Sequence, residues 1–322
     1  MGRAVAAGQA HVRAAQPRAA RPAQQSPAVT ELARHKSADQ TGRRLDHYMA
    51  KMQGPYVVNG AKVHVTPHFR TLHGESPQVT EAAVGKIRRA LGDARFTKIG
   101  MSVRHATGSR GSPAQVRETV QALIDAGALR AYSEVPPEQA IRRMMWDYRI
   151  GLDCRGYVGG AALYSRGTGD RSAPLDRMSL DMTRLTMPNN AFRTVPIATA
   201  RAGDWLHLKP DAGGRDHNVI VRSNTVHRVD GDRPVVRGKT LPSSFAREGW
   251  PAGSTPSVRV FEVDSSWGGG ERGDYGGVER RVWVHNEKSG QWAHWDAKGQ
   301  IHTSPGPYAH DLDAVYRPRR EP

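Results

Sequence analysis

The sequence predicts an α+β protein in which a helical N-terminal half packs on a mostly antiparallel β-sheet. Apolar residues recur at helical spacing between residues 80 and 148. From residue 205 onward, short alternating apolar segments are separated by Gly, Pro and Asn, which is typical of strands joined by turns. Helices followed by strands, rather than alternating with them, favour the α+β class.

Residues 1–45 are predicted to form a disordered basic leader. They are dominated by Ala, Arg, Gln and Pro and hold almost no aromatic or β-branched residues. Such a segment buries too little apolar area to offset its ordering entropy. Two readings stay open: a targeting tail that docks on a secretion apparatus or a chaperone, and a plain solvated leader.

The first ten residues lack the apolar centre of a secretory signal. A single cysteine cannot form an internal disulfide, so the fold needs no oxidising compartment. We therefore expect synthesis in a bacterial cytoplasm, with any export following a route independent of a signal peptide.

Residues 46–135 are expected to form a mixed hairpin and helical region. Val57–Val65 alternates around an Asn59-Gly60 turn, which predicts a hairpin. Ser76-Pro77 precedes a helix over 80–91, and Ser112 with Gly127 bounds a helix over 113–126.

Residues 136–316 are expected to form the catalytic domain, with residues 317–322 as a frayed tail. A helix from Pro136 to Tyr148 leads toward Cys154, and a long loop is predicted over 165–195. Strands follow over residues 205–208, 217–221, 258–264, 278–285 and 292–295.

The chain is strongly basic, with a formal net charge of +16. Its arginines are spread along the sequence without a long basic block or an aromatic–basic repeat, so nucleic-acid binding is not expected as the main role. A carboxylate-bearing peptide or cell-wall polymer suits the charge equally well. No run of about 18 apolar residues predicts a membrane span. No metal and no cofactor is expected, because a second cysteine and a His-Glu-x-x-His string are absent.

Cys154 is the candidate nucleophile. It follows Asp153 and opens a Gly- and Ala-rich stretch, which predicts a thiol at the N-terminus of a tightly packed helix. Asp153 either caps that helix or opposes the thiolate electrostatically, and capping is the favoured reading. A lone cysteine is also often only a small buried hydrophobic residue.

His217 and Asp264 are the candidate partners of the thiol. His217 shares one face of a strand with Val219 and Val221, so a histidine on a core-facing side could act as general base. Asp264 ends an apolar strand and could orient the imidazole. The plainer readings are a histidine at the rim of the sheet and an Asx-turn carboxylate.

These motifs, in this order, resemble those of the NlpC-type cysteine peptidases and amidases over about residues 140–285. The resemblance implies a papain-like fold and cleavage of peptide or amide bonds, usually in the stem peptides of bacterial peptidoglycan. It also implies that Cys154 attacks, His217 shuttles the proton and Asp264 orients the imidazole. The matching segments are Asp153-Cys154-Arg155-Gly156-Tyr157-Val158, Gly203-Asp204-Trp205, His217-Asn218-Val219-Ile220-Val221 and Glu262-Val263-Asp264-Ser265-Ser266.

The sequence departs from the family pattern at three places. Arg155 follows the cysteine where the family has a small residue, and Asn218 follows the histidine where the family has valine. A long excursion over 222–257 separates the two partner strands. For the oxyanion or the substrate, Tyr148 and Trp267 are weak candidates, each of which also fits ordinary core packing.

The sequence therefore predicts a cysteine hydrolase of peptide or amide bonds, with a secreted toxin or effector as one setting. The same parts would serve a protein-modifying deamidase or transamidase. A non-catalytic basic binding protein is the alternative from another class, and the reactivity of the Cys154 thiol separates the two classes.

Overall fold

The computed structural model describes residues 27–70, 77–167, 192–208, 217–229, 235–268, 276–295, 299–303 and 312–319. The chain divides into two compact units, Met1–Lys36 and Ser37–Pro322. In the first unit, the described residues are the opening turns of helix α1 (Pro27–Met52). No helix in these described ranges is long and apolar enough to cross a bilayer.

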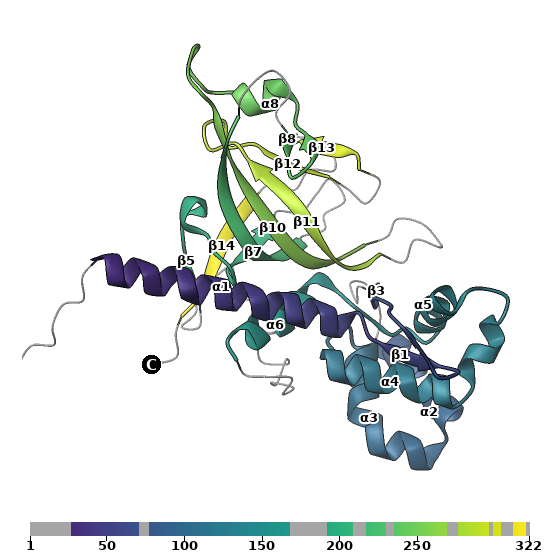
Figure 1. The fold of residues 1–322 in the computed structure, drawn as a ribbon. Coiled ribbons are helices and arrows are strands. Elements are labelled where there is room, and N and C mark those ends of the chain that lie inside the picture. Colours follow the sequence, from purple (N-terminus) through teal and green to yellow (C-terminus); the bar gives the residue numbers. More distant parts are fainter. Residues whose placement is uncertain are drawn as a thin grey trace, which may run out of the picture. The chain divides into compact units, whose positions relative to one another are not determined.

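The second unit is a mixed α+β structure with a large antiparallel sheet (Figure 1). Eight strands lie in the order β13-β12-β11-β10-β7-β6-β14-β5, and each neighbouring pair is antiparallel. The strands are β5 (Phe192–Thr194), β6 (Trp205–Leu208), β7 (His217–Arg228), β10 (Ser257–Trp267), β11 (Gly277–His285), β12 (Trp292–Trp295), β13 (Ile301–Thr303) and β14 (Leu312–Pro318).

Shorter elements complete this unit. Helix α6 (Cys154–Ser165) packs on the sheet, and the short helix α8 (Ser243–Arg247) lies in a separate apolar cluster with residues of β10, β11 and β12. Three short two-stranded pairings stand outside the large sheet. They are β1 (Tyr56–Val58) with β2 (Ala61–Val63), β3 (His68–Phe69) with β4 (Gly151–Leu152), and β8 (Val235–Val236) with β9 (Lys239–Thr240).

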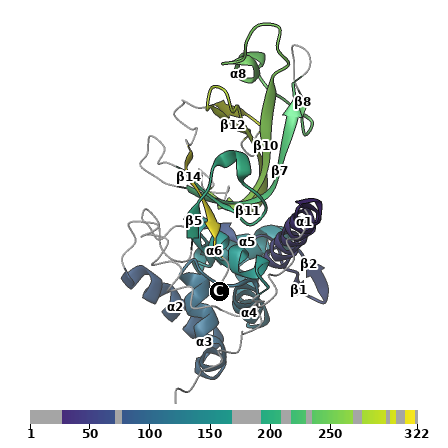
Figure 2. The same cartoon turned by 90° about the vertical axis from the view of Figure 1, so that its left-hand side faces the viewer.

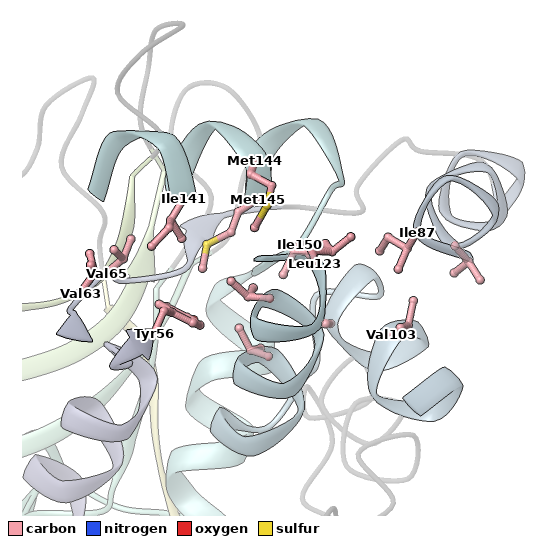
Figure 3. Close-up of a cluster of buried hydrophobic side chains, with 14 residues drawn as sticks. Tyr56, Val63, Val65, Ile87, Val103, Leu123, Ile141, Met144, Met145 and Ile150 are labelled. Carbon is pink, nitrogen blue, oxygen red and sulfur yellow. The ribbon is translucent and has the colours of Figure 1, made fainter. Parts of the chain in front are cut away.

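The N-terminal helices gather around their own apolar core, as Figures 2 and 3 show. They are α2 (Pro77–Leu91), α3 (Asp93–Thr107), α4 (Pro113–Asp125) and α5 (Pro137–Asp147), with a 3₁₀ turn over Ala128–Tyr132. Leu123, Ile141 and Met144 are fully buried in this core. Their burial explains why the apolar spacing along α4 and α5 predicts helices.

The helix boundaries follow from local chemistry. The side chain of Ser112 accepts a hydrogen bond from the Gln115 N–H, and the Gln115 side chain accepts one from the Ser112 N–H. This reciprocal capping box confirms Ser112 as the N-cap of α4. The hairpin β1–β2 turns at Asn59-Gly60, both with positive φ, as the sequence predicts.

Each of the two sheet faces around α6 is buried against a different set of side chains. Residues that pair across antiparallel strands lie on the same face, and successive residues alternate. The face that packs on α6, called here the α6 face, carries Trp205, His207, Asn218, Ile220 and Asp264. The other, called the distal face, carries Leu206, Leu208, His217, Val219, Val221, Val263 and Trp267.

The N-terminal boundary differs from the expected one. Helix α1 covers Pro27–Met52, so residues 27–45 are helical where a disordered leader was predicted, while residues 1–26 lie outside the described residues. Leu45 and Tyr48 of α1 are buried against α6. At the other end, Arg317 and Pro318 pair with β5 instead of fraying, and most of the predicted loop over 165–195 lies outside the described residues.

Candidate active site

Cys154 is the first residue of α6, as the sequence predicts. Asp153 caps this helix, because its carboxylate accepts a hydrogen bond of 2.6 Å from the Gly156 N–H. Just before it, strand β4 pairs with β3, and the Ser266 hydroxyl donates to the Leu152 carbonyl at 2.8 Å. The thiol therefore lies at a helix N-terminus, and the strand just before this helix is hydrogen-bonded to the large sheet.

The glycines of α6 permit close approach, but to other elements than the expected sheet. A Cβ on Gly156 would lie 2.0 Å from the Ser109 carbonyl oxygen, in the connection after α3. A Cβ on Gly160 would lie 2.1 Å from the hydroxyl of Tyr48 on α1. Backbone atoms and a buried ring leave no room at these distances, so both glycines are required by packing.

The sheet residue that meets the thiol is Asn218, not His217. The Asn218 side-chain nitrogen lies 3.8 Å from Cys154 Sγ and donates toward it, and both residues are almost fully buried. The indole N–H of Trp205 donates to the Asn218 side-chain oxygen at 2.9 Å. The Ser265 hydroxyl also donates to the Asn218 main-chain carbonyl at 2.6 Å. Asn218 is thus held by two neighbouring strands.

His217 lies on the distal face, away from Cys154. Its register partner is Leu208, and its ring packs against that of Trp267 in a tilted arrangement with centroids 4.3 Å apart. The structure therefore confirms that His217 shares a face with Val219 and Val221, while α6 covers the other face. The side chain that contacts the thiol is that of Asn218, the neighbour of His217 in β7.

Asp264 lies on the α6 face, but its carboxylate is engaged by arginine instead of histidine. Arg280 binds both of its oxygens at 2.7 and 2.9 Å, and the same guanidinium reaches Asp46 of α1 at 2.8 Å. Arg222 lies on β7, the strand next to that of Asp264, and it also binds Asp46, at 2.8 and 2.7 Å. Asp264 is fully buried, and burial raises the pKa of its carboxyl although Arg280 opposes that shift. The proposed orienting role toward His217 is not supported by this geometry.

The two weak candidates for oxyanion or substrate contact also lie elsewhere. Tyr148 caps the end of α5 and packs against the N-terminal helical core, with the Lys86 ammonium 4.6 Å from its ring centroid. Trp267 stands on the distal face under the Arg281 guanidinium, which is 4.1 Å from its ring centroid. Both placements agree with the packing reading rather than with contact to the thiol.

His207 is the imidazole that the sequence analysis missed. It pairs with Asn218 in the β6–β7 ladder, so its side chain lies on the α6 face beside the residue that contacts Cys154. It is half-buried, whereas Leu206 and Leu208 on either side are fully buried on the distal face. The alternation Trp-Leu-His-Leu over residues 205–208 could have indicated this placement, because it puts His207 and the two leucines on opposite faces of the strand.

Burial controls the protonation of the resting thiol. It raises the pKa of Cys154 to about 12, the charge of Asp153 adds to this rise, and hydrogen bonds from Asn218 act against it. Burial likewise raises the pKa of Asp153, while its hydrogen bond from Gly156 and the charges of Arg110 and Arg155 lower it. The thiol at rest is consequently protonated near neutral pH.

The thiol at the start of α6 contacts the amide of Asn218, and the imidazole of His207 lies beside that amide on the α6 face of the sheet. Asp264, the carboxylate expected to orient the imidazole, is bound by Arg280 instead. Within the described residues, no group of three or more His, Cys, Asp or Glu side chains could hold a metal ion. Comparison of the chain with family models, with curated proteins and with solved structures found no match.

Proposed function

We propose that this protein is a papain-like cysteine hydrolase of peptide or amide bonds, with Cys154 as nucleophile and His207 as its general base. The single observation that carries the proposal is the convergence on the α6 face. Cys154 begins the helix, Asn218 contacts its sulfur, and His207 pairs with Asn218. A helix N-terminus favours the thiolate, and an imidazole on the same face can accept its proton.

The reaction balances with these groups and water. The His207 imidazole takes the thiol proton while Cys154 Sγ attacks the carbonyl carbon of the scissile bond, which yields a tetrahedral oxyanion. Collapse expels the amine, which leaves with the proton from the imidazolium, and a thioester remains. Water, deprotonated by the same imidazole, then releases the acid and restores the thiol.

The protonated resting thiol suits general-base chemistry better than a preformed thiolate–imidazolium pair. With a pKa of about 12, the Cys154 thiol holds its proton until a base removes it during attack. A base is therefore required, and its removal should cost nearly as much activity as removal of the sulfur. The activities of His207 and His217 variants therefore show which histidine is the base.

The substrate class follows from charge. Arg110 and Arg155 are close enough to Asp153 to lower the pKa of its carboxyl, so positive charge lies beside the helix start that carries the thiol. The chain as a whole has a formal net charge of +16. We propose a carboxylate-bearing peptide, such as a peptidoglycan stem peptide, with a protein glutamine as the deamidation or transamidation alternative through the same thioester.

The test incubates purified protein with peptidoglycan and identifies released fragments by mass spectrometry. Cys154→Ser and His207→Gln should each abolish release of stem-peptide fragments, whereas His217→Gln should retain it. Equal fragment release by wild type and Cys154→Ser would overturn the hydrolase. A protein substrate that gains about 1 Da per glutamine only with the intact thiol would assign deamidation instead, because an amide nitrogen is exchanged for oxygen.

A non-catalytic basic binding protein is the second candidate. It is favoured by two observations: the thiol is buried with its pKa raised to about 12, and Asp264 is committed to Arg280. In that case Cys154→Ser would leave binding to an anionic polymer unchanged. The hydrolase requires that substrate-dependent acylation of Cys154 be trapped, which intact-mass analysis with an activated ester probe would show.

A further inference from the structure

The side chain of Asn218 is fixed in one orientation by its hydrogen-bond partners. An indole N–H can only donate, so the Trp205 contact of 2.9 Å requires the carbonyl oxygen of the Asn218 amide to face Trp205. The amide nitrogen then faces Cys154 Sγ at 3.8 Å. All three side chains are less than a tenth exposed, so water does not compete for the amide.

We infer that Asn218 is the side-chain donor that stabilises negative charge at the reacting centre, and that Trp205 is the positioning residue that sets its direction. This inference rests on the proposed function and deepens it. An amide aimed at the sulfur also points to the space where the carbonyl oxygen of an attacked bond gains charge. A donor held rigidly in a water-excluded site stabilises that charge without reorganising.

Chain geometry supports this role beyond the two hydrogen bonds. The Asn218 carbonyl is held by the Ser265 hydroxyl at 2.6 Å, which anchors the main chain from β10. The N–H of Cys154 belongs to the first turn of α6, whose donors have no acceptor inside the helix. The side-chain amide and the backbone of Asn218 both act on the same sulfur from the sheet, while the first turn of α6 adds helix N–H donors beside it.

The experiment separates donation from packing with two substitutions and a matched control, and a fourth variant, Asn218→Gln, tests for rescue. Asn218→Asp keeps the shape and the acceptor for Trp205 but removes the N–H donors. Trp205→Phe keeps the ring but removes the indole N–H, which frees the amide to turn over. Leu206→Val is the matched control, because it removes a buried methylene from the same strand on the distal face.

We expect Asn218→Asp to lower kcat by about a hundredfold with little change in KM, as for loss of one oxyanion donor. Trp205→Phe should lower kcat by about tenfold, and Leu206→Val should leave kcat unchanged. Asn218→Gln should restore part of the activity, since it returns the amide at a longer reach. An Asn218→Asp enzyme with wild-type kcat would overturn the donor role.

A second readout does not depend on the hydrolase. The rate of Cys154 alkylation by iodoacetamide near pH 9 should fall about tenfold or more in Asn218→Asp, because a carboxylate replaces a donor beside the sulfur. The alkylation rate should fall less in Trp205→Phe, and in Leu206→Val it should match that of wild type. If hydrolysis is absent while these alkylation rates hold, the proposed function fails and the donor role stands. If Asn218→Asp alkylates like wild type, the donor role fails whatever the activity.

Discussion

His217 packs against Trp267, with ring centroids 4.3 Å apart, on the face of the sheet that α6 does not cover. The two residues extend the cross-strand pairing of β7 with β10, in which Val263 faces Val221. A histidine in this position contributes ring packing to the distal face. The resemblance implies proton transfer by this histidine, whereas the proposed function assigns that step to His207, which pairs with Asn218 on the other face.

This relationship predicts that His217→Phe keeps most of the activity. Phenylalanine preserves the ring contact with Trp267 and removes the titrating ring, so kcat/KM should stay within about threefold of wild type. His207→Phe should abolish turnover under the same assay. Steady-state kinetics on a stem peptide measures both. Loss of activity in His217→Phe with normal activity in His207→Phe would reverse the assignment of the base.

The sequence predicts the start of β7 and its alternation, over residues 217–221 of a strand that extends to Arg228, but it does not specify which face meets the helix. The reason is physical: Val219 and Ile220 are both fully buried, on opposite faces. Where both faces of a strand are covered, an apolar pattern identifies strand and period but not which cover lies on which side. Only the packing of α6, a contact between residues far apart in the chain, decides that His217 points away.

Two helical segments that the sequence does not predict have similar physical causes. Helix α3 was not predicted because Thr97 and Gly100, both weak helix formers, interrupt the apolar spacing, while packing against α2 and α4 stabilises it. The buried half of α1 was missed because Leu45 and Tyr48 lie within a polar, Ala- and Arg-rich context. By contrast, Asp153 as cap and Ser112 as cap were predictable, since capping depends on residues three positions apart.

The buried thiol predicts a specific pH profile for chemical modification. Because burial raises the pKa of Cys154 to about 12, the thiolate fraction near pH 8 is far below that of an unperturbed thiol. Iodoacetamide should therefore alkylate the folded protein at least about a hundredfold more slowly than the chain in urea. Cys154 is the sole cysteine, so intact mass reports its modification directly. Rapid alkylation of the folded protein near pH 6 would instead indicate a preformed thiolate.

The ion pair between Arg280 and the buried Asp264 should contribute more to stability than an ion pair between two exposed side chains. Arg280→Met leaves the fully buried Asp264 carboxylate without its two hydrogen bonds. Loss of one partner of a buried pair costs about 3 kcal/mol or more of unfolding free energy. Urea denaturation followed by circular dichroism measures this cost.

Arg143→Met is the matched control, because the Arg143–Glu134 pair is exposed on the helical region. Its loss should cost less than about 1 kcal/mol. The double variant Arg280→Met with Asp264→Leu should recover much of the stability, since it removes the stranded charge along with its partner. Equal costs for Arg280→Met and Arg143→Met would show that the buried network does not stabilise the fold.

His68 predicts an acid-dependent loss of stability that is independent of catalysis. Its ring is buried, its Nδ1–H donates to the Phe69 carbonyl at 2.8 Å, and burial lowers its pKa to about 4. The folded state therefore favours the neutral ring, and this contribution is complete above the unfolded pKa of about 6.5. It is lost as the pH falls from there toward about 4, because the unfolded chain takes up the proton first. Between about pH 7 and pH 5 the expected loss is roughly 2 kcal/mol.

The comparison of His68→Phe with wild type isolates this contribution. Phenylalanine keeps an aromatic ring against Trp146, whose centroid lies 5.3 Å from that of His68, but it does not titrate. Unfolding free energies from urea titrations at about pH 7 and about pH 5 should differ by roughly 2 kcal/mol less in the variant than in wild type. Trp146→Phe, which alters the stacked ring and retains the imidazole, should keep the wild-type dependence. Identical pH dependence in His68→Phe and wild type would mean that another group dominates acid unfolding, and that the imidazole of His68 is not held neutral by the fold.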